Sequence, residues 1–133
     1  KLRKAGFVCM ADSRIYEDWL AKARTDLESA RILFEHGGDY ATVAFHCQQA
    51  IEKGLKGFIL KSSKQLKDGH SLIYLCRKAS AYNDDFEPYF KDCAYVNQFY
   101  IESRYPADVP ETLSKQDAEQ CLSIAERVLA LCE

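Results

Sequence analysis

The sequence predicts an all-α fold, an up-and-down bundle of four to five helices in one domain. Apolar residues recur at intervals of three and four along several long segments, and no segment alternates between apolar and polar residues as a half-buried strand would. Glycine and proline are scarce, at 6 and 3 of 133 residues, which disfavours a turn-rich β domain. With 47% hydrophobic and 29% charged residues, the composition is typical of a globular chain.

The first predicted helix spans residues 13–36, with Ser13 as its N-terminal cap. Gly37 and Gly38 end it, because glycine readily takes the positive φ of a C-terminal cap. A 100° rotation per residue places an apolar stripe on one side and acidic residues on the other. The stripe consists of Tyr16, Trp19, Leu20, Ala23, Leu27, Ala30 and Phe34.

The second predicted helix spans residues 40–61 and is capped by Asp39. The polar stretch 62–69 reads as a loop. The apolar side of this helix is formed by Val43, Ala44, Cys47, Ala50, Ile51, Gly54, Leu55 and Phe58.

Two shorter helices are expected next. His70 is predicted to open the first, which ends near residue 80, and the run 83–85 starts the second. Pro88 falls in the first turn of that helix, where its missing N–H costs little. We expect His70 to make a structural contact at the N-terminus of the first of these helices.

The last predicted helix begins with a capping box. Pro106 and Pro110 bracket an irregular segment, after which Ser114 and Asp117 stand at the spacing of reciprocal N-terminal caps. The apolar positions that follow are Ala118, Cys121, Leu122, Ala125, Val128, Leu129 and Cys132.

Composition excludes several classes of function. A formal charge of −2 argues against a protein that coats nucleic acid by charge alone. No apolar run approaches the roughly 18 residues that span a membrane, and a cytoplasmic location is expected. Residues 1–12 are predicted as a flexible leader, native from Met10 or expression-derived, and residues 13–133 as the domain.

The six cysteines are read as reduced thiols. There is no CxxC motif, and four of the six fall at apolar positions of helical patterns, where free cysteine packs as a small hydrophobic residue. No cluster of Cys and His indicates a metal site, and no motif indicates a cofactor.

The second helix carries an unusual polar stripe. Phe45 and Leu60 project near the same side, and two bulky apolar residues do not suit plain solvent. The stripe therefore suggests contact with a second copy or a partner, and the alternative is a solvated face with ordinary i,i+4 contacts. Its members are His46, Gln49, Lys53 and Lys56, flanked by Gln48 and Glu52.

A helix break is expected near Arg104. Tyr105 precedes Pro106 and is therefore pushed out of the α region, so the helix should end with a guanidinium and aromatic rings at the break. Arginine suits bidentate recognition of phosphate or carboxylate. The alternative is a helix C-terminus at which Arg104 offsets the dipole and Tyr100 packs.

An ordered series of motifs across residues 13–133 resembles the HEPN family (higher eukaryotes and prokaryotes nucleotide-binding domain). Each piece is weak alone, whereas the ordered set is specific. The pieces are Asp26-Leu27-x-x-Ala30, Gly38-Asp39-Tyr40, Ala44-Phe45-His46-Cys47-Gln48-Gln49-Ala50-x-Glu52-Lys53-x-Leu55-Lys56, His70-Ser71-Leu72-x-x-Leu75 and Tyr100-x-x-x-Arg104-Tyr105-Pro106.

The resemblance implies a small cytosolic homodimer encoded beside a minimal nucleotidyltransferase, as in a toxin–antitoxin-like pair. Such pairs resemble the two parts of kanamycin nucleotidyltransferase, whose helical part helps to bind substrate. The chain would then be a nucleotide- or substrate-binding helical module. The expected ligand contacts are Arg104 with phosphate, Tyr100 and Tyr105 stacked on a base, and Lys53, His46 and Gln49 lining the cleft. The expected dimer or partner contacts are Phe45, Leu60 and Lys56.

Two alternatives remain open. Other members of the family are metal-independent RNases that use an Arg-x(4–6)-His motif. Here Arg104 matches the arginine, but no His follows through Leu113, and Asp108 stands near the place where the shortest spacing puts it. If the chain cleaves RNA, Arg104 and Asp108 are the candidate catalytic residues. The other alternative is a purely structural interaction domain.

Overall fold

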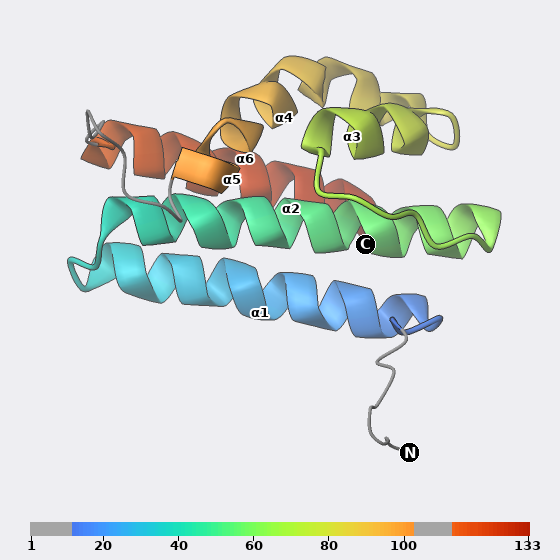
Figure 1. Ribbon diagram of the computed structural model, residues 1–133, viewed down its shortest axis with the longest axis horizontal. Helices are drawn as coiled ribbons and strands as arrows, with labels where there is room; N and C mark the ends of the chain where they lie inside the picture. Colours follow the sequence, from blue (N-terminus) through green and yellow to red (C-terminus); the bar gives the residue numbers. More distant parts are fainter. Residues whose placement is uncertain (1–11, 103–112) are drawn as a thin grey trace.

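The computed structural model describes residues 12–102 and 113–133. The described chain is helical and contains no strand, which confirms the predicted all-α class. Figure 1 shows α1 and α2 side by side, α6 behind α2, and α3 and α4 on the side of α2 away from α1. The elements are α1 (Tyr16–Glu35), α2 (Tyr40–Ser63), α3 (Leu72–Ser80), the 3-10 helix η1 (Asp84–Tyr89), α4 (Phe90–Asn97), α5 (Phe99–Glu102) and α6 (Lys115–Cys132).

The start of α1 differs from the prediction. Ile15 is the N-cap and provides no side-chain cap, so the expectation that Ser13 caps this helix was wrong. The Ser13 hydroxyl instead donates to Asp18 Oδ2 at 2.7 Å and accepts from Ile15 N at 3.1 Å. At the other end Gly37 has φ +74°, which confirms the glycine stop.

The start of α2 follows the prediction, because Asp39 Oδ2 accepts from Thr42 N at 2.9 Å. The helix continues two residues past the predicted end and stops at Ser63, where Lys64 takes the left-handed conformation with φ 64°. This long helix contacts α1, α3, α4, α5 and α6, so it is the axis around which the domain is built.

His70 does not open α3. The side chain of Ser71 accepts from Tyr74 N at 3.2 Å and caps the helix, which leaves His70 in the loop before the cap. The single helix expected from residues 83–85 onward is divided into η1, α4 and α5. Pro88 lies inside η1, one residue before its end.

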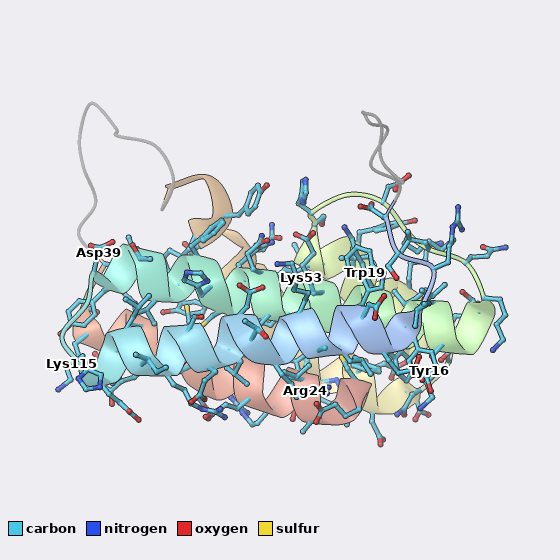
Figure 2. The ribbon with its side chains drawn as sticks, turned by 90° about the horizontal axis from the view of Figure 1, so that it is seen from below. Tyr16, Trp19, Arg24, Asp39, Lys53 and Lys115 are labelled. Atoms are coloured by element: carbon cyan, nitrogen blue, oxygen red, sulfur yellow. The ribbon has the colours of Figure 1, made fainter. Side chains whose placement is uncertain are left out.

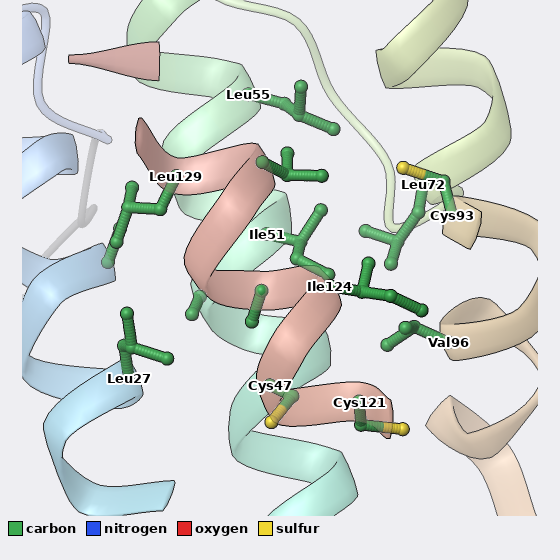
Figure 3. Packing of buried hydrophobic residues seen from close by; sticks show 14 of the residues in the cluster. Leu27, Cys47, Ile51, Leu55, Leu72, Cys93, Val96, Cys121, Ile124 and Leu129 are labelled. Atoms are coloured by element: carbon green, nitrogen blue, oxygen red, sulfur yellow. The ribbon is translucent and has the colours of Figure 1, made fainter. Parts of the chain in front are cut away.

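Two glycines allow the neighbouring helices to approach α2 closely. A Cβ on Gly57 would lie 3.1 Å from Trp19 Cβ on α1, and a Cβ on Gly54 would lie 2.9 Å from Leu129 Cδ1 on α6. Figure 3 shows Ile51 and Leu55 of α2 beside Ile124 and Leu129 of α6. The core is therefore formed mainly where α2 packs against its neighbours.

The five cysteines that the structure describes are buried and free, as predicted for reduced thiols that fill a core. Burial raises the pKa of Cys121 to about 12. Its thiolate is therefore suppressed at neutral pH. The capping box at the start of α6 is present in full, with Ser114 Oγ accepting from Asp117 N at 3.0 Å.

Candidate functional site

Asp26 of α1 contacts two of the predicted site residues of α2. Its Oδ1 atom lies 3.1 Å from His46 Nδ1, and its Oδ2 atom accepts from Lys53 Nζ at 2.6 Å. The three side chains are 15%, 28% and 25% exposed, so the carboxylate is partly shielded and the pairs are screened less than surface pairs. Asp26 is a site residue that the sequence did not single out, apart from its place in the first HEPN-like motif.

Glu52 is the centre of a second polar network. Its side chain is 5% exposed, and its carboxylate accepts from Lys56 Nζ at 3.0 Å and Gln48 Nε2 at 3.2 Å. His70 Nδ1 lies 3.1 Å from both of its oxygens. A buried carboxylate is costly unless charged and hydrogen-bonding partners compensate it, and Glu52 has both.

The signal for this network was present in the sequence. Gln48, Glu52 and Lys56 follow one another at intervals of four, and such residues lie on one face of a helix. The spacing could not reveal that the face is buried, because the cover comes from His70 and other residues outside α2.

Aromatic rings connect the two networks. The ring of His70 stacks on Tyr100 with centroids 5.2 Å apart and an interplanar angle of 19°. Tyr100 stacks in turn on Phe45 at 6.4 Å and 26°. Phe45 meets the edge of His46 at 5.7 Å. A row of rings from α2, α5 and the loop before α3 therefore lies beside the polar row of α2.

A pocket of about 380 Å³ opens at the His70 end of this row. Asn97 is fixed there, because its Oδ1 atom accepts from Leu72 N at 2.8 Å. The volume falls within the range of roughly 300–1,000 Å³ that is usual for small-molecule sites. The lining residues are His70, Ser71, Asn97, Gln98 and Tyr100.

A larger hollow of about 630 Å³ lies on the α1 side, with Trp19 and Lys53 among its lining residues. Figure 2 shows these two side chains on the same side of the molecule, near each other. Lys56 Nζ lies 5.7 Å from the centre of the Trp19 ring, a distance that allows a cation–π contact.

The predicted ligand contacts are only partly brought together. His46 and Lys53 share Asp26, whereas Tyr100 belongs with His70. Gln49 Nε2 donates to Gln48 Oε1 at 2.7 Å and so joins the Glu52 network. Arg104, Tyr105 and Asp108 lie outside the described residues.

Two of the three predicted contacts with a second copy are buried within a single chain. Leu60 and Lys56 are each 6% exposed, so they offer little surface to a partner, whereas Phe45 is half-buried. Leu60 was expected to project near the polar face of α2, but other parts of the same chain cover its side chain. Contact with a second copy stays a prediction, and Phe45 is its more accessible member.

Within residues 12–102 and 113–133, no group of three or more His, Cys, Asp or Glu side chains is placed to hold a metal ion. No helix in the same part of the chain is long and apolar enough to cross a membrane.

Comparisons with known proteins agree with this architecture. The chain is 24% identical over 124 residues to a Methanocaldococcus jannaschii protein named "Putative toxin MJ1304", and the match covers 84% of this chain and 81% of that protein. It resembles the crystal structure of TT1696 from Thermus thermophilus, with 32% identity and a TM-score of 0.79 over 88% of this chain and 94% of that one. It also resembles ST0689, an archaeal HEPN homologue, with 28% identity and a TM-score of 0.70 over 89% and 94%.

The family assignment rests on nearly the whole domain. The model of the HEPN domain matches residues 16–133, from the first residue of α1 to the end of the chain. The helical architecture matches that of the archaeal HEPN homologue. The chain therefore belongs to the HEPN domain family.

Proposed function

We propose that this protein is a nucleotide- or substrate-binding helical module that acts beside a minimal nucleotidyltransferase, in a toxin–antitoxin-like pair of genes. The observation that carries the proposal is the pocket of about 380 Å³ beside the stacked rings of His70 and Tyr100. The Methanocaldococcus jannaschii relative carries the word toxin in its name, which supports the two-gene setting.

The pocket has the chemistry that a nucleotide needs. Stacking of a base on an aromatic side chain contributes about 1–3 kcal/mol, and we propose that the base extends the stack that Tyr100 forms with His70 at the edge of the pocket. Arg104 follows Tyr100 by four residues and is proposed to contact phosphate through its guanidinium. Tyr105 is proposed as a second stacking ring.

The polar row of α2 is proposed to extend the same site. Lys53 supplies positive charge, although Asp26 neutralises part of it. His46 and Gln49 supply hydrogen-bonding groups along the helix. A ligand that reached from the pocket along this row would contact aromatic rings at one end and charged groups at the other.

Isothermal titration calorimetry with ATP, GTP and their diphosphates tests nucleotide binding. Tyr100→Ala should weaken binding about tenfold, the scale of one lost stacking contact. Tyr82→Ala is the matched control, because Tyr82 is an exposed tyrosine that lines none of the pockets described above. Absence of heat with the wild-type chain at millimolar nucleotide would reject nucleotide binding.

The partner is tested separately. The chain is expressed with the nucleotidyltransferase encoded beside it, and only this chain carries an affinity tag. Recovery of an equimolar complex supports the proposal. Recovery of the tagged chain alone, when both proteins are present in the lysate, contradicts it.

The module is also proposed to be a homodimer, with Phe45 at the contact. Analytical ultracentrifugation should show a dimer that Phe45→Ser weakens. Leu60→Ala serves as the comparison, because its side chain is buried within one chain and should lower stability without dissociating the dimer specifically. A wild-type monomer at all concentrations would exclude the dimer.

The toxin name of the relative also favours a second candidate function, metal-independent cleavage of RNA. Arg104 would hold the scissile phosphate, with Asp108 or His46 in an acid–base role. Expression should then arrest growth, and Arg104→Ala should relieve the arrest while Arg14→Ala, at an exposed position, does not. RNA that stays intact during long incubation with pure protein would exclude this candidate.

A further inference from the structure

We propose that His70 contacts phosphate in the Tyr100 pocket, in addition to Arg104, and that Glu52 is a positioning residue that holds the imidazole with Nε2 available to the ligand. The inference rests on the nucleotide binding proposed above and deepens it. It gives a ligand-binding role to a histidine for which the sequence indicated only a structural contact.

The geometry assigns each ring nitrogen a separate task. His70 Nδ1 lies 3.1 Å from both oxygens of Glu52. An ionised carboxylate only accepts hydrogen bonds, so Nδ1 must carry a proton and donate it. The Nε2 atom is thereby left as the ring nitrogen available to a ligand, as a lone pair when the ring is neutral and as an N–H donor when it is charged.

The Glu52–His70 pair is buried at Glu52 and exposed to solvent at His70. The Glu52 side chain is 5% exposed, whereas the His70 side chain is 59% exposed. Stacking on Tyr100 at 5.2 Å fixes the plane of the imidazole as well. The ring is therefore held by two contacts while it lines the pocket.

The protonation of His70 decides the net charge of the network that it forms with Glu52 and Lys56. Glu52 and Lys56 form a buried pair whose charges cancel, so the network is neutral while His70 is neutral. Protonation of His70 gives the network one net positive charge, and the exposed part of that charge is the imidazole. Within residues 12–102 and 113–133, Glu52 and Tyr100 are titratable groups that contact the ring, and the Asn97 and Gln98 side chains that line the pocket are uncharged amides.

This arrangement suits a phosphate group. An imidazolium donates a charge-assisted hydrogen bond through Nε2, and such bonds are about twice as strong as neutral ones. A bound phosphate would in turn favour the charged ring. Binding should therefore take up a proton, and affinity should fall as the pH rises through the range in which histidine side chains ordinarily titrate.

The test is calorimetry with ADP from about pH 5.5 to about pH 8, a range that brackets the ordinary titration of histidine. Measurements in two buffers of different ionisation enthalpy give the number of protons taken up. His70→Gln keeps a hydrogen-bonding side chain but cannot be protonated. It should weaken binding about tenfold near pH 6, the scale of one lost hydrogen bond to a charged group, and should reduce the proton uptake.

His36→Gln is the matched control, because His36 is an exposed histidine just after α1 and lines none of the pockets described. It should leave affinity and proton uptake unchanged. The ADP phosphate titrates in the same way in both experiments. The difference in affinity and proton uptake between His36→Gln and His70→Gln is therefore due to the His70 imidazole.

The positioning role of Glu52 needs its own variant, since removing this carboxylate alone would leave Lys56 buried without its partner. The double variant Glu52→Gln/Lys56→Met removes both charges together. NMR of the His70 ring nitrogens should then show more of the neutral tautomer that carries its proton on Nε2, because Nδ1–H has lost its carboxylate acceptor, and ADP should bind more weakly. An unchanged tautomer together with an unchanged affinity for ADP would refute the positioning role.

The outcomes separate the two proposals. If the wild-type chain binds ADP and His70→Gln binds it with the same affinity and proton uptake, the role of His70 is overturned and nucleotide binding stands. No binding of ADP by the wild-type chain at millimolar concentration would overturn both.

Discussion

The carboxylate of Glu52 lies 3.1 Å from Nδ1 of His70, although the two residues are 18 positions apart in the chain. This contact ties the loop before α3 to the middle of α2. It also brings a buried acid to an exposed base at the mouth of a pocket. The Glu52 side chain therefore belongs both to a buried network that stabilises the fold and to the proposed ligand site.

Glu52→Ala should be strongly destabilising. Lys56, whose side chain is 8% exposed, would keep an ammonium group that has lost its carboxylate, and breaking a buried pair in this way costs about 3–5 kcal/mol. Urea unfolding measures the loss. Glu28→Ala is the control, because Glu28 is 61% exposed in its pair with Arg31 and should cost less than about 1 kcal/mol. Equal losses would contradict the importance of burial at Glu52.

Gly57→Val should separate α1 from α2. The position lacks room for a side chain, since an added Cβ would lie 3.1 Å from Trp19 Cβ and from Leu20 Cδ2. Overpacking of this kind costs about 1–3 kcal/mol, which thermal or urea unfolding would detect. Ala21→Val adds a β-branched residue at an exposed position of α1 and should cost less. A stable Gly57→Val variant would mean that the two helices shift apart easily.

Tyr95→Phe should weaken stability at neutral pH more than in acid. The hydrogen bond from Tyr95 and the caps from Ser114 hold the pKa of Asp117 below its usual value. A carboxyl group whose pKa is lower in the folded state stabilises above its unfolded pKa, and this stabilisation is lost as the pH falls through the folded pKa. NMR titration should show the pKa of Asp117 rising in the variant. Tyr82→Phe, at an exposed tyrosine, should leave it unchanged.

A Cys9→Ser variant should react slowly with a thiol reagent such as DTNB until it is unfolded. The five cysteines that remain are buried, and burial raises the pKa of Cys121 to about 12, so little thiolate forms at neutral pH. A hydrogen bond from Cys93 lowers the pKa of Cys76, but that sulfur is also enclosed. Rapid labelling of one thiol in the native protein would show that part of the core opens frequently.

Local patterns in the sequence determined most of the fold. Asp39 and Ser114 cap their helices as predicted, because a cap depends on residues three positions apart. The apolar stripes of α1, α2 and α6 predicted the core for the same reason: helical periodicity decides which residues share a face. Ser13 failed as a cap because its hydroxyl bonds Asp18, a side-chain choice that propensity does not describe.

The candidate site was decided by the tertiary structure. The sequence by itself placed Gln48, Glu52 and Lys56 on one face of a helix and marked Tyr100 as a candidate ligand contact. Only packing brings Asp26 to Lys53 across 27 positions and His70 to Glu52 across 18. Periodicity describes neighbours within one helix, whereas these contacts depend on how α1, the loop before α3 and α5 are arranged around α2. That arrangement also decides that Glu52 and Lys56 are buried rather than solvated.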